Sequence, residues 1–156
     1  MYIPGWLIIV FIVVAILFYI KYRSENPPTG AMWKEAEANM QIVLDESFVP
    51  EGDELQVERK FIKTMEVDMK LLRERYKDNP EKLKQIARDW MNYSDAIVQK
   101  KTAREMLIVA HGDDVAEAIK DVQERSERAI IVIEEITKRI EKELGKDSNI
   151  KKIQNK

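Results

Sequence analysis

The sequence predicts an all-α protein, with a single N-terminal transmembrane helix followed by an antiparallel bundle of about four helices. An apolar stretch opens the chain, and the charged residues, 35% of the total, follow it. The remaining sequence repeats apolar residues at intervals of three and four, the spacing of an amphipathic helix. The short runs 106–110 and 129–133 could form strands by composition, but both lie inside longer helical patterns.

Composition excludes several kinds of site. The 156 residues include one His and no Cys. The chain therefore cannot form a His-rich zinc or di-iron centre, an iron–sulfur cluster or a disulfide framework. A formal net charge of −2 provides no overall basic field for nucleic acid. We expect no cofactor, no metal, no nucleic-acid partner and no small-molecule substrate.

The first expected element is a membrane anchor over residues 1–22. Residues 6–20 include no charged or strongly polar side chain, and about 20 helical residues span the hydrocarbon core of a bilayer. A cleaved signal peptide is the alternative, but no Lys or Arg precedes this stretch and no small-residue cleavage pattern follows it. The residues expected to hold the anchor are Trp6, Phe11, Phe18, Tyr19, Lys21 and Arg23.

The charges beside the anchor predict its orientation. Lys21 and Arg23 follow the apolar stretch, whereas residues 1–5 carry no basic side chain. By the positive-inside rule, the N-terminus lies outside and the rest of the chain lies in the cytoplasm. We therefore expect a single-pass protein of the cell membrane, with the bilayer and other protein subunits, or further copies of itself, as partners.

A linker is expected over residues 23–30, because Pro27 and Pro28 remove amide donors and disfavour helix before them. A helical bundle domain over residues 31–145 and a flexible basic tail over residues 146–156 complete the expected organisation. Within the bundle, the apolar spacing predicts helices over residues 31–44, 53–77, 80–111 and 114–144.

Local signals predict where these helices begin and end. Asp53 and Asn79 are expected N-caps, the second followed by proline at the first helical position. Gly112 and Gly145 are placed to end helices in the left-handed conformation. The polar stretch 99–104 is either a solvated part of one helix or a break into two.

The last predicted helix has the clearest periodicity. From Val115 to Ile140, apolar and small residues recur in steps of four and three, as in the seam of a coiled coil. Further apolar residues beside the seam make this surface wider than a two-stranded coiled coil needs. We expect it to contact a partner through Val115, Ile119, Val122, Ile130, Ile133, Ile136 and Ile140.

One segment resembles a chemical site. His111 and Gly112 are followed directly by Asp113 and Asp114. A helix boundary explains all of them, because a cation suits a helix C-terminus, glycine accepts positive φ, and acids suit the next N-terminus. We therefore predict no catalytic residue, and an enzyme built on His111 is the weakest of our hypotheses.

The sequence therefore predicts a noncatalytic, membrane-anchored scaffold or adaptor, or an accessory subunit of a larger membrane complex. The alternative is an envelope-facing helical module, spanin-like or a chaperone, with reversed topology. In layout the chain resembles the b subunit of rotary ATP synthases, which also joins one span to a charged helical part. That family uses one long helix, whereas Pro50, Gly52, Pro80 and Gly112 interrupt this chain, so we assign it to no family.

Overall fold

The computed structural model describes residues 5–25, 27–44, 53–109 and 115–154. These residues contain helices and short connections and no strand, so the all-α prediction is confirmed. In chain order the elements are α1 (Gly5–Glu25), α2 (Thr29–Leu44), α3 (Asp53–Arg75), α4 (Pro80–Val109), α5 (Val115–Leu144), the 3-10 turn η2 (Gly145–Asp147) and α6 (Asn149–Gln154).

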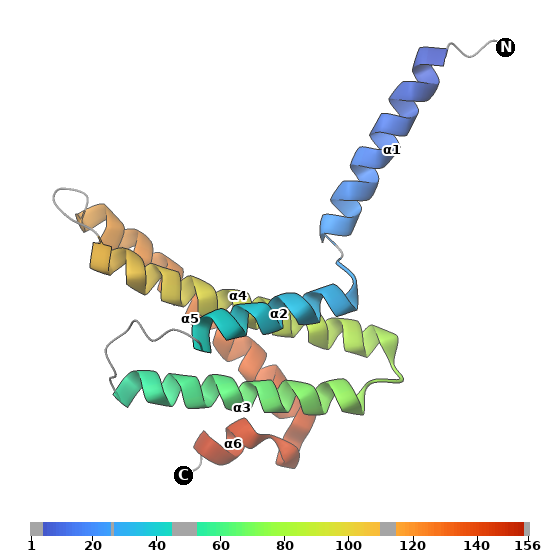
Figure 1. The fold of residues 1–156 in the computed structure, drawn as a ribbon. Coiled ribbons are helices and arrows are strands. Elements are labelled where there is room, and N and C mark those ends of the chain that lie inside the picture. The colour runs from blue at the N-terminus through green and yellow to red at the C-terminus, as the bar shows by residue number, and fades with distance from the viewer. Residues whose placement is uncertain (1–4, 26, 45–52, 110–114, 155–156) are drawn as a thin grey trace.

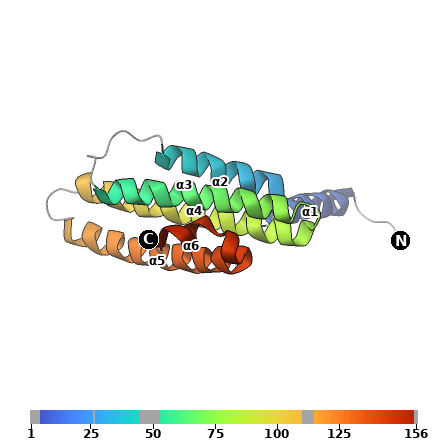
Figure 2. The ribbon, with the colours of Figure 1, turned by 90° about the horizontal axis from the view of Figure 1, so that it is seen from below.

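Helices α2 to α5 form an antiparallel bundle, in which successive helices reverse direction (Figures 1 and 2). Helix α4 is central and packs extensively against both α2 and α5. Helix α3 contacts α4 and α5 and also carries the short helix α6. Helix α1 projects away from this bundle (Figure 1). The predicted helical bundle is therefore confirmed, with α6 as an additional element.

The core consists of large apolar and aromatic side chains from all four bundle helices. The rings of Trp90 and Tyr93 stack with their centroids 5.7 Å apart, within the range that favours aromatic pairs. The helical spacing of these residues places each apolar stripe toward the bundle axis. The central members are Met32, Trp33, Ala36, Met40, Ile62, Met65, Met69, Leu72, Ile86, Trp90, Tyr93, Ile97, Ile136, Ile140 and Leu144.

Two predicted helix boundaries are confirmed. The backbone N–H of Lys82 donates to Oδ1 of Asn79 over 3.1 Å, so the asparagine caps α4 and proline takes its first position. Gly145 ends α5 with φ of 59°, a conformation that costs glycine little. The possible break at residues 99–104 does not occur, because α4 is continuous to Val109.

The structure corrects the predicted linker and tail. Helix α1 continues to Glu25 and α2 begins at Thr29, so the connection is shorter than the predicted residues 23–30. The carbonyl oxygen of Pro28 accepts hydrogen bonds from the first turn of α2. The prediction of a flexible tail is wrong for residues 146–154, which form η2 and α6. The segment from His111 to Asp114 lies outside the described residues.

Helix α1 is 21 residues long. The apolar side chains described along it, from Ile9 to Ile20, are exposed. Over the part of the chain that the structure describes, no helix has both the length and the apolarity that crossing a membrane requires. The predicted transmembrane crossing therefore stays a prediction.

Candidate functional site

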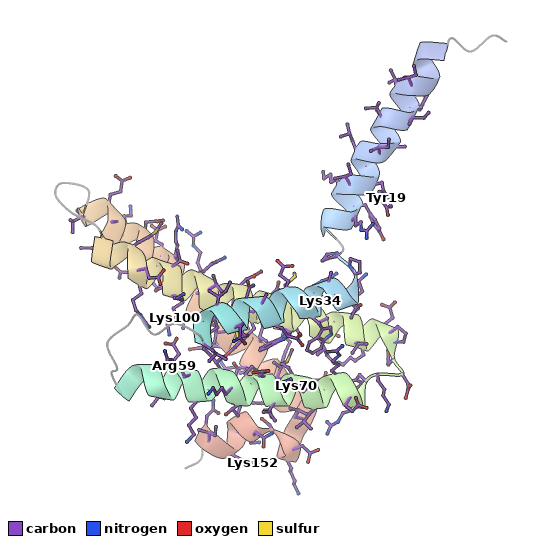
Figure 3. The ribbon with its side chains drawn as sticks, viewed as in Figure 1. Tyr19, Lys34, Arg59, Lys70, Lys100 and Lys152 are labelled. Carbon is purple, nitrogen blue, oxygen red and sulfur yellow. The ribbon has the colours of Figure 1, made fainter. Side chains whose placement is uncertain are left out.

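A concave surface lies between α3 and α6, and we call it the α3–α6 groove. Its volume is about 780 Å³. One wall comes from the outer face of α3 and the other from α6, whose Lys152 is labelled in Figure 3. The groove is open rather than enclosed, so it suits a segment of chain better than a small molecule. Its lining residues are Arg59, Lys60, Lys63, Thr64, Val67, Asn149, Lys152 and Ile153.

A buried carboxylate holds α6 in place. Asp68 of α3 has no exposed surface. Its oxygens accept hydrogen bonds from the Ser148 hydroxyl at 3.0 Å and from the Asn149 backbone N–H at 2.9 and 3.0 Å. The Asn149 side-chain amide and the Ile150 N–H donate to them at 2.7 and 3.2 Å. Since the first N–H groups of a helix have no partner within it, Asp68 caps α6 from another helix.

The groove is basic. Four of its lining residues are cationic, namely Arg59, Lys60, Lys63 and Lys152, and none is acidic. Among the described residues, no carboxylate forms an ion pair with Lys60, Lys63 or Lys152. The groove therefore presents concentrated positive charge on a chain whose net charge is −2.

The floor of the groove is apolar. Val67 is 49% exposed and Ile153 is half-buried. Val57 and Leu71 extend this surface along α3 and are also exposed. Residues 57, 64, 67 and 71 follow helical spacing, and they lie on the side of α3 opposite the residues that face the bundle core. The groove is therefore amphipathic, with an apolar floor and a basic rim.

A second polar cluster fixes the ends of α3, α4 and α5. The Glu143 carboxylate accepts hydrogen bonds from the Tyr76 hydroxyl at 2.8 Å and from the Lys82 ammonium. Arg75 donates to the Glu143 backbone oxygen at 2.9 Å and to Asp147 at 2.6 Å. The hydrogen bond from Lys82 holds the pKa of Glu143 below its ordinary value, and that from Tyr76 acts in the same direction. A carboxylate kept ionised between such donors joins helices and is a poor proton donor.

Other polar contacts join α3 to α4 and α2 to α4. Glu58 of α3 pairs with Lys100 at 2.8 Å and with Arg104 at 3.5 Å, both on α4. The Asn39 amide of α2 donates to Asp95 of α4 at 2.8 Å. Within the described ranges, no group of three or more His, Asp or Glu side chains could hold a metal ion.

The predicted partner surface on α5 is not one open face. Val122, Ile136 and Ile140 are buried because the heptad seam packs inside the bundle, chiefly against α4. Ile119 and Ile130 are exposed, and the two remaining residues of the set, Val115 and Ile133, are half-buried. The prediction of a single partner surface is therefore corrected, since its central residues already have an intramolecular neighbour.

The predicted anchor residues that can be placed lie along α1. Phe11, Phe18 and Tyr19 are strongly exposed. The Arg23 guanidinium donates to the Tyr19 hydroxyl at 3.2 Å, and Lys21 is exposed. The side chain of Trp6 is outside the described set.

Sequence reasoning missed the α3–α6 groove. The exposed stripe on α3 is visible in the sequence as Val57, Thr64, Val67 and Leu71, but only three of these four residues are apolar. Residues 146–156 contain four lysines, a composition that predicts a flexible basic tail rather than one wall of a groove. No protein-family model, curated protein or solved structure matches the chain. Function is therefore inferred from the chain's own residues.

Proposed function

We propose that the protein is a membrane-anchored, noncatalytic helical scaffold or adaptor, acting as an accessory subunit of a larger membrane complex. One observation carries the proposal: an apolar helix, whose described side chains from Ile9 to Arg23 are exposed, is joined by a short connection to a charged, well-packed bundle (Figure 1). Exposed apolar surface costs about 25 cal/mol per Å² in water. Helix α1 therefore needs an apolar environment that the bundle does not supply.

The bilayer is the environment we propose for α1. Residues 6–20 include no charged or strongly polar side chain, and about 20 helical residues span the hydrocarbon core of a bilayer. Lys21 and Arg23 follow the apolar stretch, so the positive-inside rule favours a cytoplasmic bundle. The crossing and its direction are both parts of the proposal.

The use of polar groups in the bundle supports a noncatalytic role. Asp68 caps α6, Glu58 joins α3 to α4, and Glu143 joins three helices. An acid or base in catalysis needs an exposed reactive atom near a substrate site. These carboxylates face other elements of the fold instead.

Extraction from membranes tests the anchor. We expect the full chain to stay in the membrane pellet after alkaline carbonate treatment. Replacing Val13→Lys and Ile16→Lys together places two charges at the centre of the span, which costs about 2.5–3.5 kcal/mol for each, and should release the chain. The matched control replaces two exposed apolar residues of the bundle, Ile42→Lys and Ile131→Lys, and should remain in the pellet. Release of the unaltered chain would contradict the proposal.

The absence of cysteine makes the orientation measurable. A single cysteine at Gln154→Cys should react with a membrane-impermeant thiol reagent only after lysis. A cysteine at Tyr2→Cys should react in intact cells. The opposite pattern would refute the cytoplasmic bundle and support the envelope-facing alternative.

A further inference from the structure

We propose that the α3–α6 groove binds an acidic, amphipathic segment of a partner protein. This inference rests on the proposed adaptor function, because an adaptor needs a surface for the component that it recruits. The groove offers two complementary features to such a segment. Its floor is apolar and its rim is cationic.

The apolar floor indicates a second contact face on α3. The core stripe of this helix, Ile62, Met65, Met69 and Leu72, is already buried in the bundle. The other stripe remains exposed, with Val57 at 66%, Val67 at 49% and Leu71 at 43%. Ile153 of α6 lines the groove together with Val67. A row of exposed apolar residues bordered by charges is typical of a protein contact site.

The positive charge of the groove indicates which side chains a partner should carry. Lys60 and Lys63 line the groove from α3, and Lys152 lines it from α6. A bound segment would therefore meet positive charge from both walls. Electrostatic complementarity favours acidic side chains on the partner and disfavours basic ones.

The position of the groove favours a protein segment over the membrane surface. The bundle carries α6 on the side away from the direction in which α1 projects (Figures 1 and 3). With α1 in the bilayer, the groove faces away from the lipid headgroups. Its α3 wall runs from Arg59 to Val67, about 12 Å of helix. That length accommodates about two turns of a bound helix.

A second copy of the chain offers a poorer match. Its exposed isoleucines on α5, Ile119, Ile130 and Ile131, lie among acidic side chains. Helix α5 carries eight acidic but also six basic side chains, and three of the acids pair within it: Asp121 with Arg125, Glu124 with Arg128 and Glu134 with Lys138. We therefore favour a partner that carries uncompensated acidic charge.

Binding of synthetic peptides to the full chain in neutral detergent tests the proposal. The probe is a fluorescent amphipathic peptide with leucine on one helical face and glutamate on the other, followed by anisotropy. We expect saturable binding with one peptide per chain, weakened by salt. A scrambled peptide of the same composition should bind at least about fivefold more weakly, because its apolar side chains no longer form one face. A peptide with lysine in place of glutamate should not bind.

Variants locate the binding site. Lys63→Glu with Lys152→Glu reverses one charge on each wall and should weaken binding at least about tenfold. The matched control, Lys34→Glu with Lys120→Glu, makes the same change in net charge at exposed positions on α2 and α5 and should leave binding within about twofold. Circular dichroism verifies that both variants fold. Equal loss in the two variants, or no binding by the unaltered chain, would overturn the proposal.

A fluorophore attached to the cysteine of the variant Ile153→Cys tests whether the groove binds lipid or a second copy of the chain instead. Its emission should shift on adding the acidic peptide and should not differ between phosphatidylcholine vesicles with and without phosphatidylglycerol. A shift caused by phosphatidylglycerol alone would make the groove a lipid site. Self-association abolished by Lys63→Glu with Lys152→Glu would make it an interface between copies. Either result would overturn the proposal.

The experiments distinguish failure of the membrane-anchor proposal from failure of the groove proposal. Peptide binding is measured in detergent and does not depend on where α1 lies. A chain that binds the peptide but is released by carbonate refutes only the anchor. A chain that stays in the membrane but does not bind the peptide refutes only the groove.

Discussion

Helices α3 and α5 are both long and amphipathic, but they use their apolar residues differently. Helix α5 has one strong seam, and this seam is buried inside the bundle. Its buried residues include Val122, Ala129, Ile136 and Ile140. Helix α3 has a buried stripe and a second, weaker stripe that stays exposed beside α6. The more regular pattern therefore marks an internal contact, and the less regular one marks the open surface. Periodicity identifies an apolar face but does not identify its neighbour.

The largest expected effect is on the free energy of unfolding, and it should differ between a buried and an exposed isoleucine of α5. Ile136→Ala removes a side chain that is 1% exposed and should lower the free energy of unfolding by about 2–5 kcal/mol, since it leaves a cavity. Ile131→Ala, at 56% exposed, should change it by less than about 0.5 kcal/mol. Urea denaturation followed by circular dichroism measures both. Equal losses would mean that the α5 seam is not the internal contact.

The next largest effect is expected at Asp68, the residue of α3 that holds α6 beside the exposed apolar stripe. Asp68→Ala leaves the N–H groups of Asn149 and Ile150 without their acceptor, at a cost of about 1–3 kcal/mol. We expect hydrogen exchange to accelerate in α6, while the amides of α2 and α4 keep their protection. Asp78→Ala, at an exposed position after α3, is the control and should leave α6 unchanged. Normal protection of α6 in Asp68→Ala would show that another contact holds it.

A smaller effect depends on pH at the cluster that joins α3 and α5. Because Lys82 and Tyr76 lower the pKa of Glu143, this carboxylate stabilises the fold above its ordinary pKa of about 4.3. The contribution is lost as the pH falls through the lowered folded-state value. Glu143→Gln should reduce stability at pH 7 by less than about 1 kcal/mol, because the pair is partly exposed.

Denaturation at several pH values tests the sign of this effect. The difference between the unaltered chain and Glu143→Gln should shrink as the solution is acidified below the ordinary range of glutamate. Glu74→Gln, whose carboxylate pairs with Lys77 on the surface, should show almost no difference at any pH. A difference that grows in acid would contradict the assigned direction.

The smallest effect on stability is expected in the groove itself. Val67→Ser should change the free energy of unfolding by less than about 0.5 kcal/mol, because the side chain is half exposed. It should nevertheless weaken binding of the acidic peptide. Val10→Ser on α1 serves as the control and should leave peptide binding unchanged. A large loss of stability in Val67→Ser would show that this stripe belongs to the core.

Local signals were predictable from the sequence because they act within one turn. Asn79 followed by Pro80 begins α4 as expected, and Gly145 ends α5 as expected. The core side of each helix was also predictable, since Trp33, Trp90 and Tyr93 are buried where helical spacing places them. Such signals depend on backbone geometry and hydrophobic burial, which neighbouring residues largely decide.

The support of the groove was not predictable, because it joins residues far apart in the chain. Asp68 and Asn149 are separated by 81 positions, and a single aspartate on α3 gives no sign that it will cap another helix. A tail with four lysines and one aspartate is usually solvated. Here Ile150 is fully buried, and that burial needs the bundle to be assembled first.

The sequence by itself determined the helical class, the start of α4, the end of α5 and the separation of an apolar first helix from a charged remainder. These properties follow from period, capping residues and composition, all of which act over a few residues. Only the tertiary structure decided that the α5 seam is internal and that α6 forms a basic groove with α3. The physical reason is that an apolar face gains the same free energy against any apolar neighbour, so the assembled fold selects which faces are covered.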